Sequence, residues 1–350
     1  MFAWPVRGRL IANAWSGLWM PSFLVRLFSL AFFAVFVLSG TKAVAEGLDT
    51  EKDARTWLAA ARQATVALNY QGIISYMKDG QIESLHVFHG FSGGKEQERL
   101  LSLNTPMREV IRTADKVTCY YPDAKSVSVD AKPSRHSVLL DLPGDLNELS
   151  KHYSLSLGET VEHVARRPSR VVSIEPKDDL RYGRRLWIDV DSKLPMKFEW
   201  LDENRKVLEQ MVFSSLTVVP SIPPEDLAPS TQTDNSWKTK QHETLPADSL
   251  KWALDGVPDG FRLMSYARLK RSADNRVIDH ILLSDGVSSV SIYIDEMMNE
   301  IFTAQPRKVG AINSYTRKLD KYLVTVMGEA PEKTVQSIGN GIHLQSSPGK

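Results

Sequence analysis

Apolar and polar residues alternate along much of the chain, and short alternating runs are typical of strands with one buried face. The pattern is clearest between residues 196 and 201, where Met196, Phe198 and Trp200 share one face while Lys197 and Glu199 share the other. Strict alternation of this kind predicts an antiparallel sheet with one apolar face and one face toward water.

Turn residues separate these runs. Asp-Gly pairs at 79–80 and 285–286 each join two such runs and predict hairpins. The repeated short runs favour a large antiparallel sheet over parallel strands with crossover helices. The expected strands are residues 69–77, 81–91, 99–103, 108–113, 117–121, 126–130, 170–174, 184–190, 196–201, 207–213, 261–269, 277–284, 287–295 and 321–327.

Three segments have helical spacing instead. The first starts at Asp49 or Thr50, either of which can cap it, and presents one apolar face. Short helices are also expected over residues 141–152 and 330–338, the latter with Pro331 in its first turn. The apolar face of the first helix carries Trp57, Leu58, Ala61, Thr65 and Leu68.

A proline-rich polar stretch between Pro220 and Pro246 interrupts the strand pattern and is typical of an extended linker. We therefore predict a signal peptide over residues 1–45, a large N-terminal domain over 46–219, a linker over 220–248 and a small C-terminal domain over 249–350. The 350 residues are enough for two ordinary domains.

The start of the chain predicts export. The apolar run from Leu27 to Leu38 follows Arg26 and precedes the small-residue sequence Ala43-Val44-Ala45, as in a signal peptide. The run is shorter than the ~20 residues of a membrane-spanning helix. We expect cleavage after Ala45 and a periplasmic mature protein, while Met20 is an alternative start of translation.

The composition excludes several classes of protein. The formal net charge is +1, so no global field favours nucleic acid, and we expect no nucleic-acid partner. Cys119 is the only cysteine, which rules out an internal disulfide and a four-cysteine zinc site. We predict no cofactor; whether the protein forms a homo-oligomer is left open.

The residues offer little for catalysis. Asp189 and Asp191 lie two apart on one strand face and can in principle share acid–base work, but the following residues favour a turn-forming role for them. His86 and His89 lie three apart, so a strand points them to opposite faces and they cannot chelate one metal ion. No known catalytic or nucleotide-binding motif occurs. We expect a binding protein and no enzyme.

Several runs, in order along the chain, carry a resemblance to a known family. The run PKDDLRYGRRLWIDVDSKLP at residues 176–195 resembles the P-x-D-x-x-R-Y-G-x-x-L-W-x-D-x-x-x-x-L-P signature of MucB/RseB proteins. Lys193 departs from it, because we expect Gly at that turn. Further similar runs lie at residues 69–72, 257–261, 284–286, 310–313 and 325–331.

This resemblance implies a fold and a function. The expected fold is α+β and mainly antiparallel: a large, curved, half-open β-barrel like LolA and LolB, with helices in its concave side, plus a smaller α+β C-terminal domain. The family negatively regulates an extracytoplasmic sigma factor in the envelope stress response. The implied partner is the periplasmic domain of a single-span anti-sigma factor of the RseA/MucA kind, which the protein protects from regulated proteolysis. Lipopolysaccharide or another lipid-like ligand releases that partner.

An apolar groove and basic residues are the candidate ligand contacts. Arg166, Arg167, Arg184 and Arg185 can hold a phosphate, although such a run of charges is more often a solvated sheet edge. Two alternatives remain: a lipid or lipoprotein carrier of the LolA type, which needs no second domain, and an enzyme using Asp189 and Asp191. The candidate groove residues are Ile74, Tyr76, Met196, Phe198 and Trp200.

Overall fold

The structure, a computed structural model, describes residues 39–130, 139–140, 142–143, 145–270, 276–296 and 307–345. The predicted apolar leader run, Leu27–Leu38, lies outside the described residues. Met1–Glu46 and Gly47–Lys350 form separate compact units, and the following account concerns the second. Among the described residues, no helix has both the length and the apolar character that a bilayer span requires.

The first helix, α1 (Ser39–Ala67), begins earlier than expected. The predicted start at Asp49 or Thr50 is wrong, because the backbone is already helical across Ala43 and Ala45. Alanine has the highest helix propensity, so the residues before the predicted cap extend the helix. The apolar face is confirmed, since Leu58 and Ala61 are fully buried.

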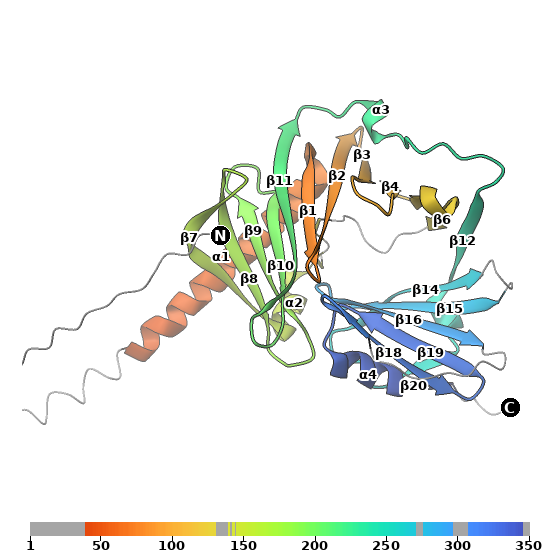
Figure 1. Ribbon diagram of the computed structural model, residues 1–350. Helices are drawn as coiled ribbons and strands as arrows, with labels where there is room; N and C mark the ends of the chain where they lie inside the picture. The colour runs from red at the N-terminus through yellow and green to blue at the C-terminus, as the bar shows by residue number, and fades with distance from the viewer. Residues whose placement is uncertain are drawn as a thin grey trace, which may run out of the picture. The chain divides into compact units, whose positions relative to one another are not determined.

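Among the described residues of the N-terminal region, 47–231, eleven strands follow, and each pairs antiparallel with its neighbours within that region (Figure 1). Their spatial order is β7-β8-β9-β10-β11-β1-β2-β3-β4-β5-β6. The bounds are β1 (Asn69–Lys78), β2 (Gln81–Ser92), β3 (Lys95–Ser102), β4 (Glu109–Thr113), β5 (Val117–Tyr121), β6 (Ser126–Asp130), β7 (Tyr153–Val164), β8 (Arg167–Pro176), β9 (Gly183–Asp189), β10 (Pro195–Leu201) and β11 (Val207–Val219).

One face of this sheet and α1 share a hydrophobic core. Leu58 of α1 is buried in the same cluster as Ile74 of β1 and Met196 of β10. The two end strands, β6 and β7, are not paired with each other in the described part of the chain, so the sheet stays half-open. The short helices η1 (Pro122–Ala124) and α2 (Leu146–His152) lie between strands, and Asp145 caps α2.

The proline-rich segment is partly ordered into secondary structure. It contains α3 (Pro224–Leu227) and β12 (Lys238–Leu245). β12 pairs parallel with β6 and antiparallel with β14, and so joins the sheet of the N-terminal region to that of the C-terminal region. The polar sequence of β12 explains why alternation did not reveal it.

The C-terminal region, residues 238–345, has its own core around Trp252, Ile281 and Val326. The predicted helix is present as α4 (Glu332–Asn340), but it begins two residues later than expected, so Pro331 precedes its first turn; α4 packs on β18 and β19. The remaining elements are η2 (Ala247–Ser249), β13 (Trp252–Leu254), β14 (Arg262–Lys270), β15 (Val277–Ser284), β16 (Ser289–Glu296), β17 (Arg307–Val309), β18 (Ile312–Leu319), β19 (Tyr322–Gly328) and β20 (Ile342–Leu344).

The predicted fold class is confirmed: the chain is mainly antiparallel, with few helices and a half-open sheet. Both Asp-Gly hairpins are present, between β1 and β2 and between β15 and β16. The division into a large domain, a linker and a small domain stays a prediction, since Gly47–Lys350 holds two cores within one compact unit.

Candidate ligand-binding site

The predicted groove residues share one sheet face. Ile74 of β1 lies opposite Phe213 of β11, and Tyr76 lies opposite Met211. Phe198 of β10 flanks Met211 on its other side. The structure therefore brings the β1 and β10 residues together in rows across three neighbouring strands.

That face is packed, however. Ile74 and Met196 are completely buried, and residues of α1 occupy the same core. The space that remains is a cavity of about 90 Å³ beside Phe198 and Trp200. Ligand pockets usually measure about 300–1,000 Å³, so this cavity is too small for a lipid chain unless the core opens.

Arg184 of β9 lines this cavity. Its guanidinium stacks over the ring of Trp200 at 4.5 Å and donates to Glu329 Oε2 at 2.7 Å and to the Val287 carbonyl at 2.5 Å. Trp200 Nε1 donates to the same carboxylate oxygen at 3.2 Å. The side chain thus ties the N-terminal region to the C-terminal region.

The other three arginines lie elsewhere. Arg185 is the next residue on β9, so it faces the opposite side of the sheet, where it donates to Glu199 at 2.5 Å. Arg167 donates to both carboxylate oxygens of Asp189, at 3.1 and 2.9 Å. Arg166 is exposed, with a left-handed φ of 65° in the turn before β8.

The four arginines therefore do not form one rim. Arg184 pairs with Ile174 across β8, whereas Asp189, the partner of Arg167, pairs with Ser169. Five residues of strand separate the two places, which is roughly 17 Å. All four arginines lie within residues 166–185, so they are close in the sequence. The strand register separates them in space, and the sequence alone does not reveal that register.

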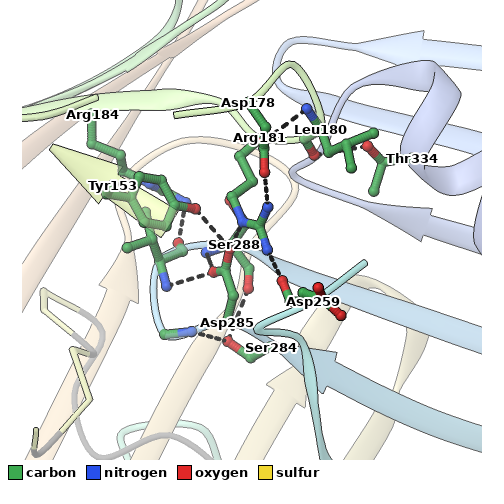
Figure 2. Close-up of polar contacts among 12 residues, drawn as sticks. Tyr153, Asp178, Leu180, Arg181, Arg184, Asp259, Ser284, Asp285, Ser288 and Thr334 are labelled. Carbon is green, nitrogen blue, oxygen red and sulfur yellow. Dashed lines mark hydrogen bonds and ion pairs between the residues drawn. The ribbon is translucent and has the colours of Figure 1, made fainter. Parts of the chain in front are cut away.

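Sequence analysis missed the buried cluster around Arg181, which lies in the connection between β8 and β9 (Figure 2). Arg181 Nε donates to Asp285 Oδ2 at 2.8 Å, and Tyr153 Oη donates to the same oxygen at 2.7 Å. The Arg181 guanidinium also bonds to Asp178 and to the Asp259 carbonyl. The side chains of Arg181 and Asp285 are each only 1% exposed.

The second carboxylate oxygen of Asp285 accepts from the backbone nitrogens of Val287 and Ser288, at 2.9 and 2.8 Å. Burial, followed by the charge of Asp285, raises the pKa of Tyr153 well above its usual range, so the phenol stays a donor. Arg181 and Asp285 both lie in the runs that carried the family resemblance, which was the available signal. Their pairing across 104 residues was not visible in the sequence.

Further polar contacts join the same two regions. Asn313 Nδ2 donates to Tyr182 Oη at 2.8 Å, and Thr334 Oγ1 donates to the Leu180 carbonyl at 2.7 Å. Glu209, which is 1% exposed, accepts from the Ala311 backbone nitrogen at 2.7 Å. Tyr76, a predicted groove residue, directs its hydroxyl to Glu209 as well. Burial, followed by the Glu209 contact, raises the pKa of Tyr76 far above its usual range.

These contacts form what we call the junction: Leu180, Arg181, Tyr182, Arg184 and Glu209 of the N-terminal region meeting Asp285, Ala311, Asn313, Glu329 and Thr334 of the C-terminal region. Arg181 pairs with Asp285 and Arg184 pairs with Glu329 across it, while Glu209 pairs with Lys78 of β1. The arrangement fits a structural coupling between two regions better than acid–base chemistry, which needs a titratable group open to substrate.

A larger cavity, of about 660 Å³, lies away from the predicted groove. Phe91, Lys95 and Ile222 are among its lining residues, with Leu227 of α3. Two of its lining residues are bonded to each other, because the Gln97 side chain donates to the Leu227 carbonyl at 2.9 Å. Its volume suits a ligand, and its wall is part apolar and part charged.

The aspartate pair does not form a catalytic site. Asp189 is fully buried and accepts from the backbone nitrogen and the hydroxyl of Ser192, at 2.8 and 2.6 Å, while Asp191 is exposed. Burial alone raises the pKa of Asp189, but the hydrogen bonds from Arg167 and Ser192 outweigh it, so the pKa is lowered. Lys193 adopts φ 63°, which shows that the turn keeps a left-handed residue where we expected Gly.

Nearly all of the chain after the predicted signal peptide matches two domains of one known protein family. Residues 53–231 match the MucB/RseB N-terminal domain, and residues 246–343 match the MucB/RseB C-terminal domain. The sigma-E factor regulatory protein RseB of Escherichia coli (strain K12) is 26% identical over 317 residues, covering 89% of this chain and 97% of that protein. The sigma factor AlgU regulatory protein MucB of Pseudomonas aeruginosa is 26% identical over 309 residues, covering 85% and 93%.

Solved structures are similar in fold. MucB from the complex structure of Pseudomonas aeruginosa MucA/MucB has a TM-score of 0.68 at 23% identity, covering 84% of this chain and all of that one. A crystal structure of MucB in complex with MucA(peri) has a TM-score of 0.66 at 22% identity, with the same coverage. At this level of identity the similarity establishes the fold.

Proposed function

The chain belongs to the MucB/RseB family, and from this premise we propose that it is a periplasmic regulatory protein that binds the periplasmic part of an anti-sigma factor. By holding that segment it protects the anti-sigma factor from regulated proteolysis and keeps an extracytoplasmic sigma factor inactive. The protein acts by binding and performs no reaction of its own.

The observation that carries this proposal is the match to both family domains along one chain. A solved relative, MucB, is held in a complex with MucA(peri), and the curated relatives are named as regulators of sigma factors. A simple lipid carrier has no use for the matched C-terminal region or for the junction that fixes it. The charges at the junction are paired and buried, which supports a binding protein.

The proposal includes a lipid-like ligand that releases the partner. The packed face at Ile74 and Met196 supports this only if the core opens, whereas the cavity of about 660 Å³ beside Phe91 has room already. Phe91→Asp and Arg184→Ser distinguish the two places. The variant that loses direct binding of the lipid, while keeping its fold by circular dichroism, marks the ligand site.

Reconstituted proteolysis tests the function. The periplasmic segment of the organism's own anti-sigma factor is incubated with its membrane-tethered protease, with and without the mature protein. We expect the protein to slow cleavage at least about tenfold, a coupling of about 1.4 kcal/mol or more, and lipopolysaccharide to restore it. Cleavage at the same rate with and without the protein would reject the regulator proposal.

A further inference from the structure

Exposed apolar side chains gather at one end of the N-terminal sheet. Among the described residues, four of the exposed large apolar side chains lie where strands β1 to β4 end or are joined, and we call them the apolar band: Met77, Ile82, Leu103 and Met107. Ile82 is 64% exposed and Leu103 is 47% exposed. Contiguous exposed apolar surface marks an interaction site more often than single exposed residues do.

Backbone contacts show that the band is continuous. Met77 lies directly opposite Ile82 in the β1–β2 pair. The Leu103 nitrogen donates to the Ser84 carbonyl at 2.8 Å, two residues along from Ile82. The Ser102 nitrogen donates to the Arg108 carbonyl at 2.8 Å, which brings Met107 next to the end of β3 that carries Leu103.

The size of the band suits a short peptide segment. It crosses the ends of four neighbouring strands, β1 to β4, which Figure 1 shows side by side. At a strand spacing of about 4.8 Å it extends roughly 14 Å. That length equals about nine residues of helix or about four residues of extended chain. Methionine side chains adapt to different partner surfaces, and the band has two.

The charges around the band indicate the polarity of the partner. Within it, Arg108 is paired with Glu83, so no net charge opposes an apolar contact. At one end the Gly310 nitrogen donates to Asp79 Oδ1 at 2.9 Å, which holds the exposed residues Arg307 and Lys308 near the β1–β2 turn. This end is therefore basic and complements acidic residues on a partner.

We propose that the apolar band docks an amphipathic segment of the anti-sigma factor, with acidic residues at the end that meets Arg307 and Lys308. This inference rests on the proposed function and adds to it the surface and the chemistry of the partner segment. The apolar face of the partner segment covers Ile82, Leu103 and Met107, and the rest of the partner lies beyond the band.

The test is the affinity of the full mature protein for the purified periplasmic segment of the anti-sigma factor, measured by isothermal titration calorimetry. We expect I82D/L103D to weaken binding at least about 100-fold, since each aspartate places a charge in an apolar contact. V161D is the matched control, because Val161 is 49% exposed at the β7–β8 turn, outside the band. It should bind within about twofold of wild type.

The possible outcomes separate the two proposals. If the wild type binds and I82D/L103D binds equally well, the band is not the docking surface, although the proposed function stands. If the wild type binds nothing, the proposed function is wrong and the band assignment falls with it. If I82D/L103D only turns a wild-type dimer into monomers in sedimentation velocity, with unchanged partner affinity, the occupant is a second copy and the proposal is overturned.

Hydrogen exchange on the wild type keeps the test valid if the double variant does not fold. On addition of the anti-sigma segment, amides at residues 82–84 and 103–108 should exchange more slowly, while those at residues 160–166 should not change. Unchanged exchange over the band, in a sample where binding is saturated, would contradict the proposal.

Discussion

Arg181 shows why a single buried residue can fix the relation between two distant parts of a chain. Its guanidinium has donors for Asp285, Asp178 and the Asp259 carbonyl at once, which a lysine cannot match because it lacks the planar fork of donors. Breaking a buried ion pair leaves an uncompensated charge, and this usually costs about 3–5 kcal/mol. The residue therefore matters for stability and for the position of the C-terminal region.

We predict that Arg181→Met lowers the free energy of unfolding by about 3–5 kcal/mol, measured by urea denaturation. Arg205→Met is the matched control, since Arg205 pairs with Glu175 on the surface and is 74% exposed. Its loss should cost at most about 1 kcal/mol. Equal losses for the two variants would mean that the Arg181 cluster adds nothing to stability.

Asp189 should make stability depend on pH. Its pKa is lowered in the folded protein, so the folded state binds fewer protons here than the unfolded chain does. The stabilisation is complete above the unfolded pKa of about 3.9 and is lost as the pH falls below it. Asp189→Asn should therefore destabilise the protein more at about pH 6 than at about pH 3.

Urea denaturation of the wild type and of Asp189→Asn, each at about pH 6 and about pH 3, measures how the loss in free energy of unfolding depends on pH. Asp191→Asn is the control, because that neighbouring carboxyl is exposed, and it should change the free energy of unfolding by less than about 0.5 kcal/mol. A penalty for Asp189→Asn that is the same at both pH values would show that the Arg167 contact does not depend on the ionised carboxylate.

The alternation of apolar and polar residues predicted which side chains of β1 and β10 share one face of the sheet, because side chains alternate between the two faces along a strand. It placed Met196, Phe198 and Trp200 together correctly. It could not show that α1 would fill this face, or that Arg184, 145 residues before Glu329, would turn to that carboxylate, because neither contact follows from a local pattern. Pairing between distant polar residues has no local pattern.

Among the elements, the strands β7, β12, β13, β17, β18 and β20 were not predicted, and β7 and β12 illustrate two different causes. The start of β7 alternates Tyr153, Leu155 and Leu157, all buried, so its pattern was available in the sequence. β12 is polar, and its backbone pairing with β6 and β14 carries no apolar signal. The proline-rich segment thus contains a strand that the composition alone described as a linker.

The contacts of this segment predict where a protease cuts it. Glu109 accepts from the backbone nitrogens of Ser230 and Thr231, both at 2.8 Å, and β12 begins at Lys238. Residues 232–236 lie between these anchors and are exposed. Limited proteolysis should cleave within residues 232–237 first, because this backbone is exposed and its own hydrogen bonds are confined to a local turn at residues 234–237.

Mass spectrometry of the fragments locates the cut. The two pieces should co-elute in size-exclusion chromatography, because the junction still joins them. A first cut within residues 222–231, or within β12, would contradict the role assigned to these contacts.

At the scale of the whole molecule, two hydrophobic cores meet through the polar contacts of the junction and through Val287 and Ala311, which pack against the N-terminal core. Polar interfaces between regions permit relative motion more readily than large apolar ones do. A ligand that binds better to one arrangement than to the other shifts the balance between them by its difference in affinity. The junction is therefore where release of a partner can be coupled to a second ligand.

The central claim is that this protein binds the periplasmic segment of an anti-sigma factor. Isothermal titration calorimetry of the mature protein against that segment, from the same organism, measures it directly. The account predicts a one-to-one complex with a Kd of about 1 μM or tighter, about −8 kcal/mol or more favourable. Absence of binding heat, together with separate elution of the two proteins at concentrations of tens of micromolar, would contradict it.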